Sequence, residues 1–174
     1  MKAVIQRVTK ASVSVNGEII NNIGNGLCIL IGIKRDDTIE DMKYIVKRIL
    51  NIKMFDDDDN NKKWSKNVMD KEYEILCISQ FTLYHTLKGN RLDFHKAMPA
   101  QAAESFYNNF LIELGKNYKP ELIKDGKFGA TMEVNIKNSG PVTLEIESPL
   151  KLNESNQYFD IIRVSDKARY LMLK

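Results

Sequence analysis

The sequence lacks most of the features by which enzymes and membrane proteins are commonly recognised. Its 174 residues include only two cysteines and two histidines. Two isolated cysteines form neither a disulfide framework nor a paired-cysteine metal site. A phosphate-binding glycine loop, a zinc-protease helix and a serine-hydrolase elbow are all absent. No conventional nucleophile-and-base arrangement is therefore visible in its motifs.

Long apolar runs are also absent. No stretch approaches the roughly 18 apolar residues that a membrane-spanning helix requires. The opening residues carry charges at Lys2 and Arg7, and no small-residue cleavage site follows them, so they do not resemble a signal peptide. We therefore expect a cytoplasmic protein without a membrane partner.

An excess of charge of either sign is missing too. The 26 basic and 23 acidic residues leave a net charge of +3. Residues 151–174 hold five basic and three acidic side chains, and the other residues, 21 basic against 20 acidic, are nearly neutral. A net charge of +3 is compatible with an RNA partner but does not by itself indicate one. A contact between RNA and the main body would depend on a local patch, backbone groups or shape.

Short strand patterns dominate what is present. Strands are expected over residues 2–8, 12–15, 18–23, 26–33, 73–78, 131–136 and 142–147. The Asn16-Gly17 dipeptide between two of them is the strongest short signal for a hairpin. Cys28 and Cys77 lie within apolar runs, which favours buried free thiols that act as small apolar side chains.

Two helices are expected, over residues 38–51 and 100–116, because apolar residues recur there at helical spacing. Thr38 can cap the first helix, with Asp41 three residues later. The four aspartates within residues 56–63 are interpreted as a solvated loop rather than a metal site, because adjacent carboxylates lack an ordered spacing.

The strands are not separated by regular helices, which argues for an α+β fold. We expect a mainly antiparallel sheet, curled or barrel-like, with two main helices and a basic loop over residues 84–96. One domain is expected over residues 1–149. Residues 150–174 form an extension of unknown role, with an ambiguous pattern of strand and helix.

Two segments contain residue types that could form a functional site rather than serve the fold alone. Ser79-Gln80-Phe81-Thr82 follows a buried strand, where hydroxyl, amide and freed backbone N–H groups can form an oxyanion hole. An ordinary strand end with polar residues explains the segment equally. Gly140-Pro141 lies between two expected strands, where a hairpin turn is the simple interpretation. A cis Gly-Pro bond that presents its carbonyl groups to a pocket is the alternative, since glycine lets a ligand approach the backbone.

These two segments resemble the two signature motifs of the D-aminoacyl-tRNA deacylase family. The resemblance continues, in order and over roughly residues 1–148, at residues 4–8, 88–90, 93–95 and 126–130 and at Met132. Departures are small. Leu92 stands where proline is common in the family, and Ser139 stands where an acidic residue is common.

The resemblance implies a homodimer whose substrate is the aminoacylated 3′ end of tRNA. The residues implied to line the position of the terminal adenosine and its aminoacyl ester are Ser79, Gln80, Phe81 and Thr82. Phe128, Gly129 and Met132 are implied to bind substrate beside them. Gly140 and Pro141 enter from the other subunit with a cis peptide bond, and Arg7 braces that segment. The carbonyl groups of Gly140 and Pro141 are implied to stand where an L side chain would point. D-amino acids and glycine are then accepted, and L-amino acids are rejected.

The implied reaction is hydrolysis of the ester in D-aminoacyl-tRNA, without a metal or organic cofactor. We expect a water molecule to attack, helped by the 2′-hydroxyl of the adenosine, with the N–H groups of Phe81 and Thr82 binding the oxyanion. The Thr82 hydroxyl as a covalent nucleophile is the rival mechanism. Two other functions stay open: a nucleic-acid-binding regulatory module that uses the basic tail, and an enzyme of this fold that acts mainly on mischarged glycyl-tRNA.

Overall fold

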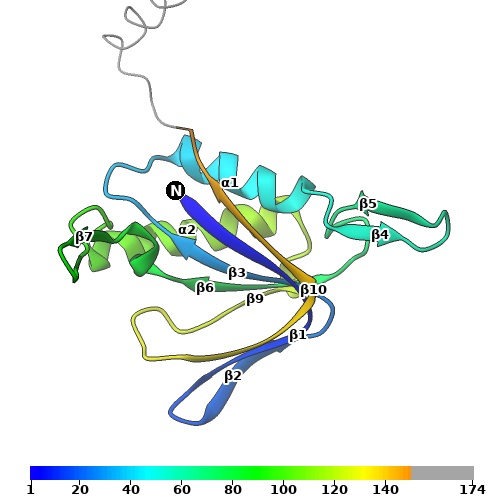
Figure 1. The fold of residues 1–174 in the computed structure, drawn as a ribbon, viewed down its shortest axis with the longest axis horizontal. Helices are drawn as coiled ribbons and strands as arrows, with labels where there is room; N and C mark the ends of the chain where they lie inside the picture. The colour runs from blue at the N-terminus through cyan, green and yellow to red at the C-terminus, as the bar shows by residue number, and fades with distance from the viewer. Residues whose placement is uncertain (150–174) are drawn as a thin grey trace, which may run out of the picture.

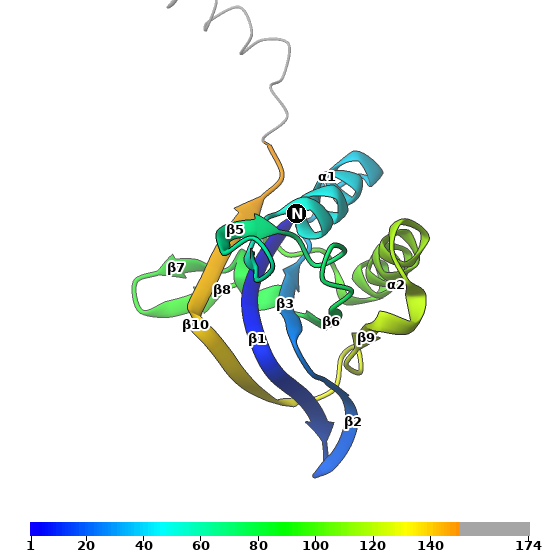
Figure 2. The same ribbon diagram turned by 90° about the vertical axis from the view of Figure 1, so that its right-hand side faces the viewer.

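The computed structural model describes residues 1–149. Figures 1 and 2 show a sheet that curls into an incompletely closed barrel, with the two long helices on one side. The strands are β1 (Lys2–Val15), β2 (Glu18–Ile23), β3 (Gly26–Gly32), β4 (Phe55–Asp57), β5 (Lys62–Lys66), β6 (Glu74–Ser79), β7 (Thr86–Lys88), β8 (Arg91–Asp93), β9 (Ile123–Asp125) and β10 (Glu133–Glu147). The helices are α1 (Ile39–Asn51) and α2 (Ala100–Asn117), with short 3-10 helices η1 (Phe81–Tyr84) and η2 (Pro120–Leu122).

The main sheet has the order β10-β1-β3-β6-β9, and β2 pairs with β1 beside this path. β1 is antiparallel to β10, β2 and β3, whereas the β3–β6 and β6–β9 pairs are parallel. A parallel pair needs a long crossover, which α1 and the β4–β5 hairpin supply between β3 and β6. The sheet is thus mixed, with antiparallel pairs in the majority. The expected α+β fold with a curled sheet and two main helices is confirmed.

The expected strands at residues 2–8 and 12–15 are the two ends of one long strand, β1. The predicted hairpin that follows is confirmed, because β1 and β2 pair across Asn16-Gly17. Asn16 has φ of 52° and Gly17 has φ of 81°. Positive φ at both central residues is what the tightest hairpin turns require.

The separate strands and connecting turn expected over residues 131–147 are wrong. The structure has one strand there, β10, and both of its halves pair with β1. Gln6 pairs with Thr143 and Val8 pairs with Asn138, so β1 advances by two residues while β10 advances by five. The surplus residues of β10 bulge out of the sheet, and Gly140-Pro141 lies in this bulge.

The loop expected over residues 56–63 is correct only for the turn at residues 58–61, since β4 and β5 pair on either side of it as a hairpin. Its aspartates bond to the hairpin itself: Asp56 accepts a hydrogen bond from the Trp64 N–H at 2.9 Å, and Asp57 forms a salt bridge with Lys66 at 3.3 Å. The basic loop expected at residues 84–96 similarly contains the small β7–β8 hairpin.

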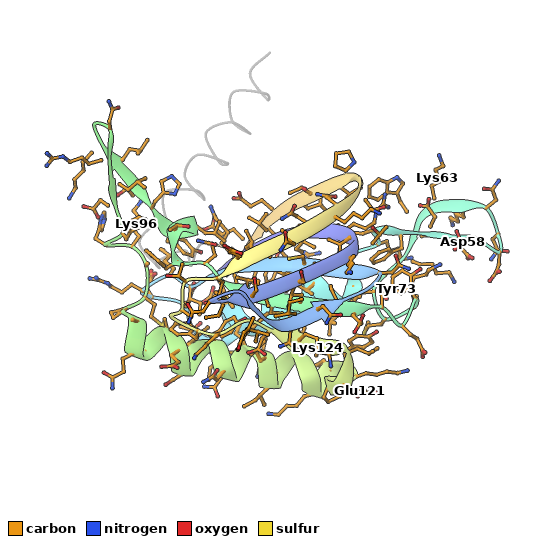
Figure 3. All side chains as sticks on the ribbon, turned by 90° about the horizontal axis from the view of Figure 1, so that it is seen from below. Asp58, Lys63, Tyr73, Lys96, Glu121 and Lys124 are labelled. Atoms are coloured by element: carbon orange, nitrogen blue, oxygen red, sulfur yellow. The ribbon has the colours of Figure 1, made fainter. Side chains whose placement is uncertain are left out.

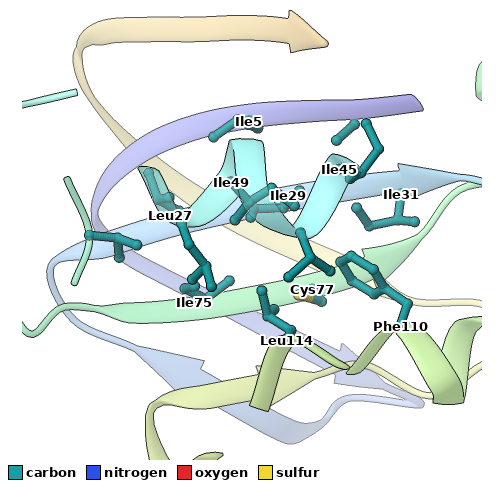
Figure 4. Close-up of a cluster of buried hydrophobic side chains, with 14 of the residues drawn as sticks. Ile5, Leu27, Ile29, Ile31, Ile45, Ile49, Ile75, Cys77, Phe110 and Leu114 are labelled. Carbon is teal, nitrogen blue, oxygen red and sulfur yellow. The ribbon is translucent and has the colours of Figure 1, made fainter. Parts of the chain in front are cut away.

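Both helices pack on the same face of the sheet and enclose the larger of two apolar clusters (Figure 4). Cys77 belongs to this cluster, whereas Cys28 belongs to a smaller cluster inside the curl of the sheet. Both thiols are fully buried and free, as expected. Burial raises the pKa of Cys28 to about 11 and raises that of Cys77 further. Neither thiol is therefore ionised at neutral pH.

α1 begins at the cap predicted for it. The carboxylate of Asp41 accepts hydrogen bonds from the backbone N–H and the hydroxyl of Thr38, both at 2.8 Å. Within residues 1–149, no helix is both long and apolar enough to cross a membrane. The expected extension, 150–174, lies outside the described residues.

Candidate active site

A cavity of about 680 Å³ opens at the carboxyl end of β6. The sequence-predicted residues that line it are Ser79, Gln80, Phe81, Phe128, Gly129 and Met132. Much of the remaining wall is apolar and comes from β3, from the segment before α2 and from the start of α2 and β10. A mostly apolar cavity with a few polar groups at one edge is the usual form of a small-ligand site.

The polar edge of the cavity arises where β6 changes into η1. The Gln80 N–H donates to the Ile31 carbonyl of β3 at 2.7 Å, and η1 then begins with the Leu83 N–H donating to the Gln80 carbonyl at 3.2 Å. The N–H groups of Phe81 and Thr82 precede this first helical bond. No carbonyl within η1 can accept from them, which leaves both as donors for a ligand.

The Thr82 side chain is joined to the site through Gln80. The Gln80 amide Nε2 donates to the Thr82 hydroxyl at 2.5 Å. The nearby His85 ring approaches the Thr82 carbonyl at 2.8 Å rather than its hydroxyl. The hydroxyl is therefore partnered by an amide, which is not a base.

An aromatic pair lines the cavity. Phe81 is 57% exposed, and its ring packs edge-to-face on the half-buried Phe94 with ring centroids 5.0 Å apart. Across the cavity, a tight turn closed by the Ala130 N–H and the Lys127 carbonyl at 3.2 Å places Phe128 in the wall. Flat apolar surfaces on both sides suit the stacking of a nucleobase.

The other signature segment forms a second cluster, on the bulge of β10. The Gly140-Pro141 peptide bond is cis, and Gly140 has φ of 118°. A β-carbon on Gly140 would lie 2.7 Å from Val142 Cγ2 and 2.9 Å from Arg7 Nη2, so only glycine fits this position. The Asn138 side chain accepts from the Val142 N–H at 2.9 Å and closes the base of the bulge.

Arg7 connects this bulge to the β4–β5 hairpin. Its Nε donates to the Ser139 carbonyl at 3.2 Å, and its Nη1 donates to the Met54 carbonyl at 2.7 Å. Its guanidinium also lies over the ring of Trp64, 5.3 Å from the ring centroid. Trp64 was not anticipated from the sequence, because nothing in residues 56–63 signals a hairpin that returns to β1.

The two clusters are far apart within one chain. On β3, Leu27 pairs with Arg7 and Ile31 pairs with Ser79. The clusters are therefore offset by four residues in the direction of β3. They are also separated by the three strand spacings from β10 to β6, and together these offsets give a distance of about 20 Å. Figure 1 shows the bend of β10 at one end of the sheet and β7, next to the cavity, at the other. The structure therefore places Arg7, Gly140 and Pro141 away from the cavity, and Thr82 contacts the cavity lining only through Gln80. The predicted residues that it gathers in the cavity are Ser79, Gln80, Phe81, Phe128, Gly129 and Met132.

Arg35 and Met98 line the cavity without any signal in the sequence, and Phe94, which lies in a segment that resembles the family, had no predicted site role. They come from loops whose positions depend on a bridge between Lys34 and Ala97. Among residues 1–149, no three histidine, cysteine, aspartate or glutamate side chains gather as a metal site would require.

Comparison with known proteins places the chain in a class of hydrolases that act on the ester of aminoacyl-tRNA. The family model described as D-Tyr-tRNA(Tyr) deacylase matches residues 4–147, and the chain belongs to this family. The membership expected from the two signature motifs is thereby confirmed.

Individual relatives agree. The chain is 61% identical over 149 residues to human D-aminoacyl-tRNA deacylase 1, covering 86% of this chain and 71% of the relative. It is 60% identical to the mouse protein of the same name, with the same coverage. A solved structure of a c-Myc DNA Unwinding Element Binding Protein matches with a TM-score of 0.83 at 61% identity, covering 86% of this chain and 100% of that one.

Proposed function

We propose that this chain hydrolyses the ester of D-aminoacyl-tRNA in the cytoplasm and releases the D-amino acid and tRNA. The observation that carries the proposal is the cavity at the end of β6, which joins two open N–H donors to apolar walls. The terminal adenosine stacks against Phe128 and Met132 beside Gly129, and the ester carbonyl points at η1.

The chemistry is water attack on the ester carbonyl. The N–H groups of Phe81 and Thr82 donate to the developing oxyanion, which is the stabilisation that acyl transfer needs most. Thr82 is a poor candidate for a nucleophile, because the partner of its hydroxyl is the Gln80 amide. The 2′-hydroxyl of the adenosine orients the attacking water, and Ser79 and Gln80 hold the edge of the site.

The site is completed by a second copy of the chain. About 20 Å separates the cavity from Gly140-Pro141 within one chain, too far for one substrate carbonyl to contact both. In a symmetric dimer each bulge enters the cavity of the partner. Its carbonyl groups occupy the space of an L side chain, so D-aminoacyl and glycyl esters are cleaved and L-aminoacyl esters are rejected. Arg7 holds the bulge in this shape.

A DNA-associated role is the second candidate function. It is favoured by the similar solved structure, which carries the name of a DNA Unwinding Element Binding Protein. Deletion of residues 150–174 separates the two candidates, because a deacylase keeps its turnover without them and a module that binds DNA through the basic tail does not.

The deciding experiment incubates the protein with D-Tyr-tRNA, L-Tyr-tRNA and Gly-tRNA in parallel. Release of D-tyrosine and glycine with the L ester intact supports the proposal. Equal cleavage of both tyrosyl esters contradicts steric rejection, and cleavage of none contradicts the function.

Light scattering at micromolar concentration should give twice the 20.0 kDa chain mass. An active monomer is incompatible with a site shared between subunits.

A further inference from the structure

A group of exposed cations lies beside the mouth of the cavity. The β7–β8 hairpin projects from the molecule next to η1, as Figures 1 and 2 show. Lys88 and Arg91 pair across this hairpin, and Lys96 follows it. The Lys96 carbonyl accepts from the Arg35 N–H at 2.9 Å, which ties Lys96 to the cavity wall. We refer to Lys88, Arg91 and Lys96 as the basic rim.

The basic rim carries a local excess of positive charge. Residues 84–96 contain three basic side chains and one acidic side chain, a net charge of +2 without their two histidines. Residues 1–149 contain 21 basic and 20 acidic side chains, a net charge of +1. All other described residues therefore sum to −1. The net charge of +2 on residues 84–96 therefore lies beside the cavity mouth, where it attracts an anionic ligand.

The one carboxylate of this segment does not neutralise the whole rim. Asp93 pairs with Lys88 and with the His95 ring, and it also accepts from the His95 N–H at 2.9 Å. These contacts, that of Lys88 first, hold the pKa of Asp93 well below its usual range. They also fasten the hairpin in place. Among residues 1–149, Arg91 and Lys96 form no salt bridge.

We propose that the basic rim binds the sugar-phosphate backbone of the tRNA nucleotides that precede the terminal adenosine. This inference rests on the proposed deacylase function. A terminal nucleotide that enters the cavity leaves the preceding nucleotides at its mouth, next to these cations. Contacts to phosphate carry no sequence information, so they position any tRNA alike. The rim supplies affinity for the RNA, and the cavity supplies the chemistry.

The test compares a substrate that has the preceding phosphates with one that lacks them. We would measure kcat/KM for D-Tyr-tRNA and for D-tyrosyl-adenosine with wild type, Arg91→Ala, Lys96→Ala and the double variant. Each lost phosphate contact should lower kcat/KM on the tRNA by about threefold, and both together by about tenfold, in moderate salt. Cleavage of the nucleoside ester should stay within about twofold, because it makes no phosphate contact.

The dependence on salt gives a second readout. A plot of log kcat/KM against log salt concentration should become shallower by about 0.7 for each phosphate contact that is lost. Arg91→Lys keeps the charge and should restore most of the slope. Lys116→Ala is the matched control, since this exposed lysine lies about 24 Å along α2 from Ala100 at the cavity. It should leave both the rate and the slope unchanged. Figure 3 places Lys96 at the end of the molecule opposite Lys63.

Equal losses on the tRNA and on the nucleoside ester would show that these residues shape the cavity, and would overturn the proposal. Unchanged rates and slopes on the tRNA would overturn it as well. Failure of the wild-type protein to cleave either D substrate would instead contradict the deacylase function.

Discussion

The two ends of the curled sheet use their polar groups differently. At the cavity end, η1 leaves the N–H groups of Phe81 and Thr82 outside its own hydrogen bonds. At the other end, the bulge of β10 is braced from several sides: Arg7 reaches two carbonyl groups, and Asn138 bonds to the Val142 N–H. One end presents free donors to a ligand, whereas the other holds a fixed backbone shape. The proofreading by shape that we propose needs both, because free donors stabilise a reaction and a rigid wall rejects the wrong substrate.

The largest effect is expected from breaking the rigid end with Gly140→Ala. The new β-carbon would clash with Val142 Cγ2 at 2.7 Å and with Arg7 Nη2 at 2.9 Å. A bulge displaced by about 1 Å should cost about a hundredfold in kcat/KM for D-Tyr-tRNA. Circular dichroism and light scattering check that the variant folds and dimerises.

Subunit mixing tests whether the two ends work in trans. Ala103→Trp fills the cavity, because Ala103 lines it at the start of α2. A mixture of Gly140→Ala and Ala103→Trp subunits should recover about a quarter of all sites, since half of the dimers then hold one intact site. Recovery of no activity by fully mixed dimers would place both ends of a site in the same subunit.

A smaller effect is expected at the open end from Thr82→Ala, which keeps the backbone N–H. If the main chain and the RNA carry the chemistry, kcat should fall by no more than about a hundredfold. Loss of a covalent nucleophile would instead cost roughly 10⁴-fold. Single-turnover kinetics on D-Tyr-tRNA distinguish these two outcomes. A second substrate, a D-Tyr-tRNA that ends in 2′-deoxyadenosine, tests the role of the 2′-hydroxyl. Our mechanism expects wild type to cleave that substrate slowly.

Trp64→Ala should weaken the rigid end mildly. It removes the ring that lies 5.3 Å from the Arg7 guanidinium, a contact of about 0.5–1 kcal/mol at an exposed site. We expect the ratio of kcat/KM between D-Tyr-tRNA and L-Tyr-tRNA to fall by about twofold to fivefold. Trp64→Phe retains an aromatic face and should keep most of the ratio. An unchanged ratio in Trp64→Ala would mean that Arg7 holds the bulge unaided.

The smallest functional effect is expected in the core between the two ends. Cys28→Ala and Cys77→Ala each remove a buried sulfur and should cost on the order of 1 kcal/mol of stability. For a domain of this size that lowers Tm by about 2–4 °C. The kcat/KM on D-Tyr-tRNA should not change. Lost turnover at an unchanged Tm would reveal a catalytic thiol.

Most structural features that depend on residues close together in the sequence were predicted correctly, whereas features that depend on distant residues were not. The Asn16-Gly17 hairpin, the Thr38 cap and both long helices were correct, because each depends on residues within one or two turns of chain. The single β10 strand was missed, since its continuity depends on β1, more than a hundred residues away in sequence. The β4–β5 hairpin was missed because four adjacent aspartates suggest solvent, whereas three of them, Asp56, Asp57 and Asp58, have partners in Trp64, Asn60, Lys66 and Lys71.

The sequence by itself determined the two signature segments, the buried thiols and the family, because these depend on the identity and order of residues. Only the tertiary structure decided that the two segments lie at opposite ends of one sheet, and that Trp64 stands over Arg7. Strand register decided the first, since pairing of β1 with β3 and β10 sets which residues meet, and the return of the β4–β5 hairpin to Arg7 decided the second. Register depends on contacts between distant segments, and no local pattern of side chains specifies it completely.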